Sequence, residues 1–378
     1  MDWISCLKYQ NPLSNVYVGS PSLIKMSNGN LLAIHDYFGS GMCDENFSLS
    51  SIYLSTDGGS NWSNITHIKG ITWATLFNYQ NSVYLIGASK AFGDIVIFRS
   101  DDYGYSWTKP VDEKSGILFK AGPGMQTPNY HCAPTPVVEH KGRIYRAFED
   151  NVMKTGERDF ETFVISCKAD ADLLDASNWV MSNKLFYNKD LDSPEWGEYH
   201  GKNNSEWLEG NIVEAPDGTL LNILRVHSAP VTDKAAIIRI CENGKKISFD
   251  YKDFIDFPGG SHKFTIHKDE ETGFYCTISN KNVFKERAYQ RNVLSFHVSK
   301  DLKQWYHICN LMEDDQGLSQ EDSIEKTGFQ YVDWQFDGDD IIYLVRVAYN
   351  DAPNFHDSNY IVFNRIKNFR EIICGGIN

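Results

Sequence analysis

The side chains in this sequence that could do chemistry recur at two kinds of position, just before and just after a predicted pair of strands. Glu209 precedes one such pair and Arg225 follows it, and Tyr331 and Arg346 bracket another in the same way. Carboxylates, tyrosines and arginines at one cavity would suit a carbohydrate, because acids and bases act on a glycosidic oxygen and cations bind anionic substituents. We therefore expect these residues to share a pocket.

The elements that must position these residues form a repeat. A strand, a tight turn and a second strand recur six times along the chain. The turns lie at Asn28-Gly29, Gln80-Asn81, Lys141-Gly142, Asp217-Gly218, Thr272-Gly273 and Asp337-Gly338. Most of these pairs suit the positive φ that two-residue hairpins need, and their spacing leaves room for four strands per repeat. The sequence predicts an all-β fold, a six-bladed β-propeller with four-stranded antiparallel blades, as a single domain over residues 1–378.

A second motif follows several hairpins. Ser55–Trp62 and Ser100–Trp107 both match S-x-D-x-G-x-x-W, the Asp box, and degenerate copies lie at Asp172–Trp179 and Ser299–Trp305. The Asp accepts backbone N–H groups, the Gly takes the unusual dihedral angle and the Trp packs beneath the turn. We expect these boxes to be structural, on turns between third and fourth strands and away from the pocket.

In a propeller, the start of each first strand and the loop after each second strand open on the same face. Applied to the six repeats, this rule gives a polar, charged and aromatic set of residues. Besides the residues named above, the predicted substrate-binding residues are His35, His131, Glu149, His262, Lys263 and Asp333.

Asp boxes on a six-bladed propeller resemble the sialidases (neuraminidases), and the resemblance covers nearly the whole chain. The segment from Glu209 to Gly218 that leads to Arg225 is similar to the sialidase segment with the catalytic Glu and a carboxylate-binding Arg. Arg291, before the degenerate box at Ser299, looks like another Arg of the sialidase triad. Tyr331, before the turn at Asp337, resembles the nucleophile.

The resemblance implies a retaining exo-glycosidase that releases sialic acid or a related acidic sugar. Tyr331 would be the nucleophile, Glu209 would activate it, and Asp44, with Asp36 as second choice, would be the acid/base. A neutral tyrosine suits a sugar with a carboxylate on its anomeric carbon, because that carboxylate would repel an anionic nucleophile. Arg225 and Arg291 would bind the carboxylate through charge-assisted hydrogen bonds.

One position departs from the sialidase pattern. Sialidases begin the first repeat with Arg-Ile-Pro, whereas this chain reads Gly19-Ser20-Pro21, so Gly19 stands where the first triad Arg belongs. Arg346, Arg146 or Lys90 would have to replace it from another blade, or the substrate is another sugar.

Two other functions fit the same residues. The additional histidines, such as His35, His131 and His262, would also suit a glycosidase of other specificity or a lyase that cleaves uronic-acid polysaccharides. A non-catalytic, glycan-binding propeller is the third alternative, since a fold does not determine a function.

The composition of the chain limits the classes of partner that it could bind. The formal net charge of -14 disfavours a nucleic-acid binder, which needs basic residues to neutralise phosphates. The eight cysteines contain no CxxC pair, and we expect neither a metal nor a cofactor. The N-terminus has no leader pattern and no apolar run approaches the roughly 18 residues of a membrane helix. We expect a soluble, cytoplasmic chain as given, secreted or periplasmic only from a precursor with a leader, and leave its oligomeric state open.

Overall fold

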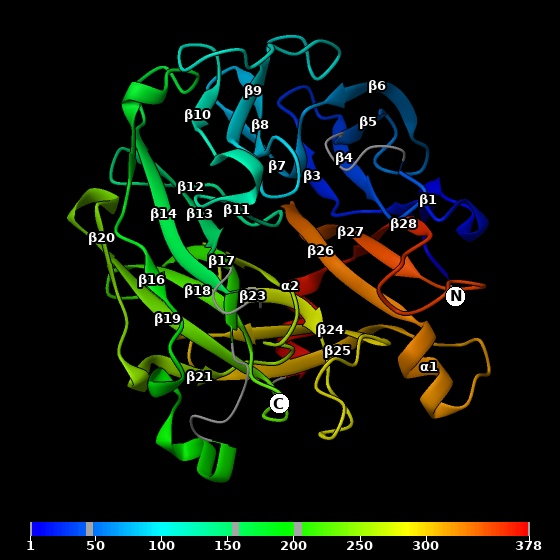
Figure 1. Cartoon of the computed structure of the whole chain (residues 1–378). Coiled ribbons are helices and arrows are strands. Elements are labelled where there is room, and N and C mark those ends of the chain that lie inside the picture. Colours follow the sequence, from blue (N-terminus) through cyan, green and yellow to red (C-terminus); the bar gives the residue numbers. More distant parts are fainter. Residues whose placement is uncertain (1, 43–47, 153–158, 200–205, 377–378) are drawn as a thin grey trace.

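The computed structural model of the chain describes residues 2–42, 48–152, 159–199 and 206–376. Six antiparallel sheets surround a common axis, as Figure 1 shows. The predicted all-β, six-bladed propeller is therefore confirmed.

Blades I to III take up the first half of the chain. In blades I and III the inner strand is split into two short segments. Blade I comprises β2 (Tyr17–Val18), β3 (Ser22–Lys25), β4 (Leu31–Phe38), β5 (Leu49–Ser55) and β6 (Ser63–Lys69). Blade II comprises β7 (Thr72–Tyr79), β8 (Ser82–Ala88), β9 (Ile95–Ser100) and β10 (Ile117–Phe119). Blade III comprises β11 (Tyr130–His131), β12 (Val138–His140), β13 (Arg143–Asn151), β14 (Phe160–Lys168), β15 (Trp179–Met181) and β16 (Leu185–Phe186).

Blades IV to VI complete the ring, with two short α-helices beside them. Blade IV comprises β17 (Glu206–Glu214), β18 (Leu220–His227), β19 (Lys234–Cys241), β20 (Lys246–Ser248) and β21 (Phe254–Asp256). Blade V comprises β22 (Thr265–Lys268), β23 (Tyr275–Asn280), β24 (Val293–Ser299) and β25 (Trp305–Glu313). Blade VI contains β26 (Gly328–Asp337), β27 (Asp340–Ala348) and β28 (Tyr360–Ile366); the helices are α1 (Gln320–Lys326) and α2 (Phe369–Gly376).

The fourth strand of blade VI comes from the other end of the chain. Strand β1 (Ser5–Tyr9) pairs with β28, antiparallel, so that the first and last strands of the chain lie side by side. The repeat pattern in the sequence did not reveal this closure. It joins the two ends of the ring by backbone hydrogen bonds, which also removes one of the free sheet edges.

The predicted hairpin turns adopt the expected backbone. Gly29, Gly218, Gly273 and Gly338 all have positive φ, and at the third turn Lys141 and Gly142 both do. The second turn places Gln80 at φ 52°. The turn residues therefore fixed the positions of all six hairpins, as their chemistry indicated.

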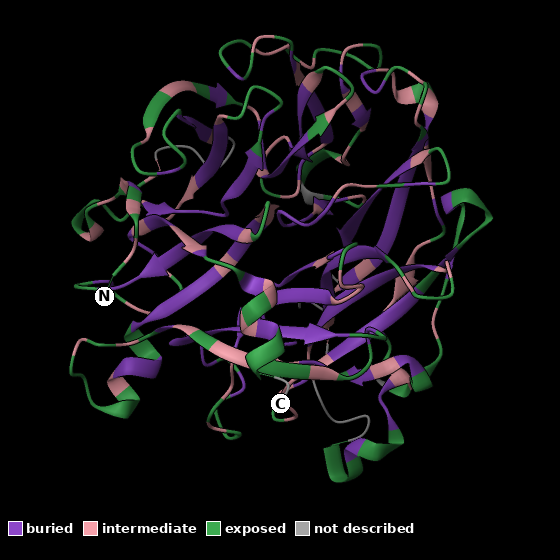
Figure 2. Cartoon of the chain, turned by 180° about the vertical axis from the view of Figure 1, so that it is seen from behind, coloured by how far each residue is buried: buried purple, intermediate pink, exposed green. Residues whose placement is uncertain are grey.

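The hydrophobic core is divided among the gaps between neighbouring blades. One cluster joins blades I and II, and the other five clusters fill the remaining gaps in turn. Figure 2 shows the strands largely buried and the connecting loops exposed. Because each blade is covered on both faces, its second strands, such as β8 and β27, are buried over nearly their whole length.

The two full S-x-D-x-G-x-x-W turns have the same internal hydrogen bonds. Asp57 accepts from the backbone N–H of Asn61 at 2.9 Å, and the Trp62 indole N–H donates to the Gly59 carbonyl at 3.1 Å. In the second turn Asp102 and Trp107 make the equivalent bonds. The first turn also meets the neighbouring blade, because a Cβ atom on Gly59 would lie 2.1 Å from the Phe363 ring of blade VI.

This contact allows a matched test of how blades I and VI pack. Gly58 and Gly59 both have positive φ, but only a side chain at Gly59 meets another group. We expect Gly59→Ala to lower the free energy of unfolding by about 1–3 kcal/mol more than Gly58→Ala, because both changes strain the backbone and only Gly59→Ala overpacks the contact. Denaturant titration of the two variants measures the difference. Equal losses would mean that the turn moves away from Phe363 without penalty.

Candidate active site

Three inner strands carry a bulge at the same place, and each bulge contains one non-glycine residue at positive φ. The strand register shifts between Thr72 and Thr75 in β7, and the same shift occurs near the starts of β17 and β26. The residues inside these bulges are Trp73, Glu209 and Tyr331, with φ of 52°, 58° and 54°. Non-glycine residues at positive φ are strained, and such strain gathers at functional sites. The bulges belong to alternate blades: II, IV and VI.

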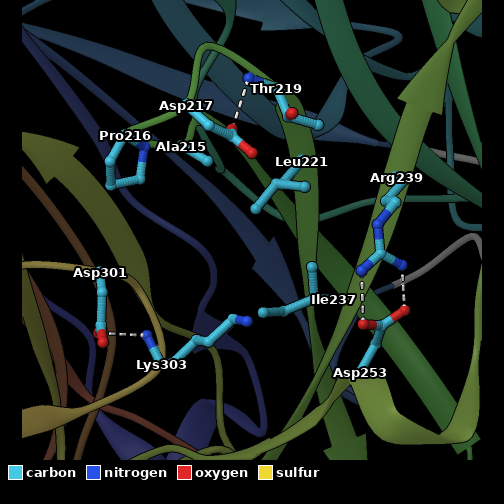
Figure 3. A pocket seen from close by; sticks show the side chains of 10 residues that line it. All are labelled: Ala215, Pro216, Asp217, Thr219, Leu221, Ile237, Arg239, Asp253, Asp301 and Lys303. Carbon is cyan, nitrogen blue, oxygen red and sulfur yellow. Dashed lines mark hydrogen bonds and ion pairs between the residues drawn. The ribbon is translucent and has the colours of Figure 1, made fainter.

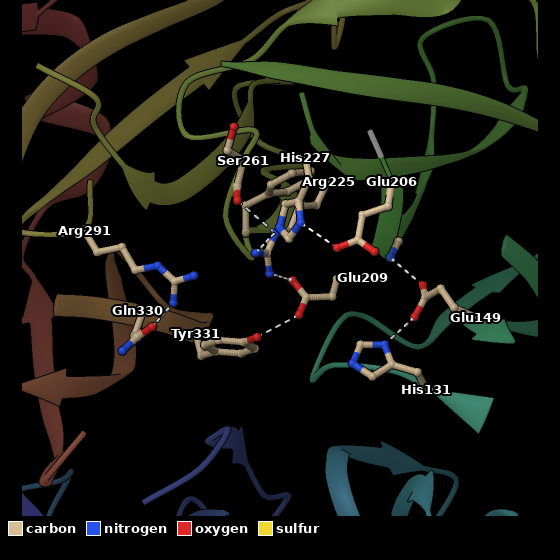
Figure 4. Close-up of polar contacts among 12 residues, drawn as sticks. His131, Glu149, Glu206, Glu209, Arg225, His227, Ser261, Arg291, Gln330 and Tyr331 are labelled. Carbon is tan, nitrogen blue, oxygen red and sulfur yellow. Dashed lines mark hydrogen bonds and ion pairs between the residues drawn. The ribbon is translucent and has the colours of Figure 1, made fainter. Parts of the chain in front are cut away.

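Two of these bulge residues, from blades IV and VI, are joined by a hydrogen bond (Figure 4). The Tyr331 hydroxyl donates to Glu209 Oε1 at 2.9 Å, and Arg225 Nη1 donates to Glu209 Oε2 at 2.6 Å. Arg225 Nε also donates to the Ser261 carbonyl at 3.0 Å, and its other terminal nitrogen contacts His227 Nε2. Arg225 and Glu209 are almost fully buried, so this chain of polar groups has a fixed geometry.

The surroundings set the charge of both reacting groups. Burial alone would raise the pKa of Glu209, but the charges of Arg225 and His131 and the hydrogen bonds from Arg225 and Tyr331 lower it to about 2. Burial, together with the Glu209 charge, raises the pKa of the Tyr331 hydroxyl. At neutral pH the site therefore holds an ionised carboxylate that accepts a hydrogen bond from a neutral phenol.

Two further guanidinium groups lie at the same tyrosine. Arg346 stacks over the Tyr331 ring, with its guanidinium carbon 4.9 Å from the ring centroid, and Arg291 donates to the Gln330 side-chain oxygen. Burial lowers the pKa of Arg291 to about 9, with Arg225 and Arg346 adding to the effect by repulsion. Within the described residues neither Arg291 nor Arg346 forms an ion pair with a carboxylate. Of the three guanidinium groups at this site, only that of Arg225 is therefore paired with a carboxylate among the described residues.

Gly19 has no room for the side chain that the sialidase pattern would place there. A Cβ atom on Gly19 would lie 1.7 Å from Asp36 Oδ1. The Asp36 carboxylate accepts from the backbone N–H groups of Ser20 and Trp73, each at 2.7 Å, and from the Thr72 hydroxyl. Burial raises the pKa of Asp36. Asp36 therefore occupies the volume beside Gly19 and anchors the bulge at Trp73.

The opposite side of the pocket holds a histidine and a carboxylate from blade III. His131 Nδ1 lies 3.1 Å from Glu149 Oε2, and the backbone N–H of Gly210 donates to Glu149 Oε1 at 3.4 Å. Figure 4 shows His131 and Glu149 across from Tyr331, with Glu209 between them. The predicted residues Glu149, His131, Glu209, Arg225 and Tyr331 are thus brought together.

His262 lies buried behind the arginines. Neither of its ring nitrogens has a hydrogen-bond partner of normal geometry within the described part of the chain, although the Tyr289 backbone lies nearby. Burial, Arg291 and Arg225 lower the pKa of His262 well below its usual range. It is therefore a neutral ring that adds no charge to the site.

Other predicted residues lie away from the reacting groups. His35 stacks on Tyr53 inside blade I, with ring centroids 5.5 Å apart. Lys263 donates to Thr265 and to the Val332 carbonyl, and Asp333 accepts from Ser22, so both link neighbouring inner strands.

Of the three groups considered as substitutes for the first triad Arg, Arg346 lies at Tyr331. Arg146 is buried between blades II and III, where it donates to Thr135 and Thr75. Asp44, the expected acid/base, lies outside the described residues.

The structure adds two aromatic residues that the sequence analysis missed. The Phe38 ring packs 4.6 Å from the Arg346 guanidinium carbon, and the Phe355 ring packs 5.2 Å from that of Arg291. Phe38 is the last residue of the second strand of blade I. It lies two positions after Asp36, so the rule for residues at the ends of second strands would have included it if the window had been two residues longer. Phe355 lies in the loop before β28, where no turn signal fixes its direction.

A second hollow lies at the far ends of the same strands. It has a volume of about 370 Å³ and is lined by residues of the β17–β18 turn and of blade V (Figure 3). Arg239 pairs with Asp253 there, and the carboxylates of Asp217 and Asp301 accept backbone N–H groups. The described residues contain no group of three or more His, Cys, Asp or Glu side chains suited to a metal ion. No helix among them is both long and apolar enough to cross a membrane.

No protein-family model and no curated protein matches the chain. The fold is similar to that of several solved structures. A sialidase of Trypanosoma rangeli in complex with sialic acid is 15% identical, with a TM-score of 0.61, over 96% of this chain and 55% of that one. An α-L-arabinanase of Penicillium chrysogenum complexed with arabinobiose is 14% identical, with a TM-score of 0.57, over 96% and 97%. An α-L-arabinofuranosidase of Fusarium graminearum in complex with an iminosugar inhibitor is 12% identical, with a TM-score of 0.58, over 98% and 99%.

These proteins share the fold of the chain but bind different sugars: sialic acid in one complex and arabinobiose in another. The chain spans about half the length of the trypanosomal sialidase and nearly all of the two arabinan-type enzymes. At such low identity the likeness shows the propeller fold, and the function has to be argued from the site itself.

The contact between Gly19 and Asp36 can be tested by a double-mutant cycle. We expect Gly19→Ala to destabilise the protein by about 1–3 kcal/mol, because the new methyl group collides with the Asp36 carboxylate. In an Asp36→Ala background the same change should cost clearly less, since only the Asp36 backbone oxygen, 3.1 Å from the Cβ position, remains close. Thermal or denaturant unfolding of the four proteins gives the coupling. Equal penalties in both backgrounds would show that Asp36 does not fill this space.

Proposed function

We propose that the chain is a retaining glycoside hydrolase that acts on a sugar with a carboxylate at its anomeric carbon. The observation that carries the proposal is the hydrogen-bonded series Tyr331–Glu209–Arg225, with the guanidinium groups of Arg291 and Arg346 around the same tyrosine. The similarity in fold to sialidases and to arabinan-type hydrolases supports a glycosidase.

The geometry suits a tyrosine nucleophile. The Tyr331 hydroxyl already donates to Glu209, so its proton has an acceptor as the oxygen attacks the anomeric carbon. Arg225 holds Glu209 from the other side and keeps its free oxygen directed at the tyrosine. The raised pKa of Tyr331 keeps the phenol neutral in the resting site, so that it does not repel an anionic sugar.

The unpaired guanidinium groups argue for an acidic substrate. Among the described residues Arg225 pairs with Glu209, whereas the buried Arg291 and Arg346 have no ion-pair partner, and burying charges without partners is unfavourable. A bound sugar carboxylate would supply the missing negative charge and accept directional hydrogen bonds. It would also offset the field that lowers the pKa of Glu209, and so make Glu209 a stronger base in the complex than in the free protein.

The role of Tyr331 as nucleophile is tested by removing its hydroxyl oxygen. We expect Tyr331→Phe to lower kcat/KM on an aryl glycoside of a 2-keto sugar acid by at least about 100-fold, because the attacking oxygen is lost. Tyr343→Phe is the matched control, since Tyr343 is buried within blade VI and lies on the strand next to Tyr331. Release of the aryl group is followed by absorbance. Full activity of Tyr331→Phe would exclude this mechanism.

The acidic substrate is tested by binding. We expect Arg346→Gln to weaken the binding of the free sugar acid by roughly 10- to 100-fold, because hydrogen bonds to charged groups contribute about 1.5–3 kcal/mol. Arg287→Gln should have no effect, since Arg287 pairs with Glu321 on the surface. Calorimetric titration of the three proteins, with a neutral arabinoside for comparison, provides the measurement. A parent protein that binds the arabinoside more tightly than the acid would overturn the proposed substrate class.

A further inference from the structure

His131 and Glu149 form a dyad of the kind that transfers protons. Glu149 is fully buried, and its two oxygens meet His131 Nδ1 and the backbone N–H of Gly210. A carboxylate at Nδ1 fixes the proton on that nitrogen and leaves Nε2 as the reactive position. Among the described residues Glu149 is the only hydrogen-bond partner of the His131 ring. Figure 4 shows the second ring nitrogen turned towards the side on which Tyr331 lies.

Three aromatic rings surround this histidine. The ring centroids of Trp73, Phe160 and Phe92 lie 4.6, 5.0 and 6.1 Å from that of His131, and its side chain is 12% exposed. Trp73 reaches this position through its bulge, which Asp36 holds at the backbone. The rings hold the imidazole in place and leave its side chain only partly accessible to water. The charged groups that face His131 are Glu149 from β13 and Glu209 from β17.

We propose that His131 is the acid/base of the reaction and that Glu149 is its positioning residue. This inference rests on the proposed glycosidase function. It assigns protonation of the leaving group to His131 on blade III, whereas the resemblance to sialidases assigned it to Asp44 or Asp36 of blade I. A histidine suits the position because the nearby guanidinium groups would keep a carboxyl group ionised, without a proton to donate, whereas the dyad presents an imidazole and keeps its carboxylate behind it.

The proton transfers balance in both steps. In the first, the Tyr331 oxygen attacks the anomeric carbon and its proton passes to Glu209, while His131 Nε2 protonates the glycosidic oxygen as the bond to the leaving group breaks. The leaving group departs as a neutral alcohol. In the second step, water attacks the anomeric carbon and its proton passes to His131 Nε2. Tyr331 then leaves the carbon and recovers its proton from Glu209.

The test compares leaving groups. We expect His131→Gln to lower kcat/KM by about 100- to 10,000-fold for a glycoside with an alcohol leaving group, because such a group needs a proton. For a dinitrophenyl glycoside, whose dinitrophenolate leaves as a stable anion, kcat/KM should fall by no more than about tenfold. His307→Gln is the control, because His307 is an exposed histidine on blade V. Equal losses for both leaving groups would overturn the assignment and leave His131 a structural role.

The positioning role of Glu149 is tested with the same pair of leaving groups. We expect Glu149→Gln to lower kcat/KM more for the alcohol glycoside than for the dinitrophenyl glycoside, because the imidazole loses the carboxylate that orients it. Equal losses for both leaving groups in Glu149→Gln would contradict the positioning role.

The outcomes separate this inference from the function on which it rests. Full activity of Tyr331→Phe rejects the glycosidase mechanism, and with it the role of His131. An inactive Tyr331→Phe together with equal losses for both leaving groups in His131→Gln keeps the glycosidase and rejects only the dyad. Circular dichroism and thermal unfolding of each variant show whether the fold is intact.

Discussion

The pairing of β1 with β28 is the constraint on which the arrangement of the site depends. Blade VI carries both Tyr331 and Arg346, and its outermost strand is supplied by the N-terminal segment. The inner strand of blade VI in turn meets blade I through Asp333 and Ser22, whose contact distance is 2.8 Å. Because blades III, IV, V and VI all contribute to one pocket, the distances between their side chains hold only while this ring is closed.

Within the closed ring, electrostatics decides the roles of similar groups. Glu209 and Asp36 are both buried carboxylates near the axis, yet their pKa values shift in opposite directions. Glu209 is lowered because Arg225 and Tyr331 donate to it, whereas Asp36 is raised because burial outweighs its three hydrogen bonds. One carboxylate faces the pocket and remains charged, while the other joins the backbone segments behind Trp73.

The sequence predicted the fold well because tight turns are local. Each hairpin could be recognised from the residues at its own turn. The pairing of Glu209 with Arg225 also followed from one hairpin, since the two residues bracket the same pair of strands. By contrast, the closure by β1 joins segments at opposite ends of the chain, and no local pattern encodes it. His35 and Asp36 were both expected at the pocket, but neighbouring residues on a strand face opposite sides, so His35 packs on Tyr53.

Gly19 stands where sialidases have an arginine, and Arg346 on another blade lies at Tyr331 instead. This exchange of positions shows a different limit of prediction. The absence of an arginine at Gly19 was visible in the sequence, but its replacement depended on which distant guanidinium reaches Tyr331. Arg146 lies in the first half of β13 (Arg143–Asn151), whereas Arg346 lies near the end of β27 (Asp340–Ala348). Arg146 is enclosed by the strands of blades II and III, while Arg346 lies against Tyr331 and Phe38.

That exchange also has a stereochemical consequence. With a glycine in blade I and a guanidinium in blade VI, the three cations span an arc over blades IV to VI instead of encircling the axis. An anion that contacts all three guanidinium groups would therefore lie off the axis, nearer to blades IV to VI than to blade I. On the side of blade I the Asp36 carboxylate is already engaged by the backbone N–H groups of Ser20 and Trp73, so that side offers a ligand shape rather than a cation.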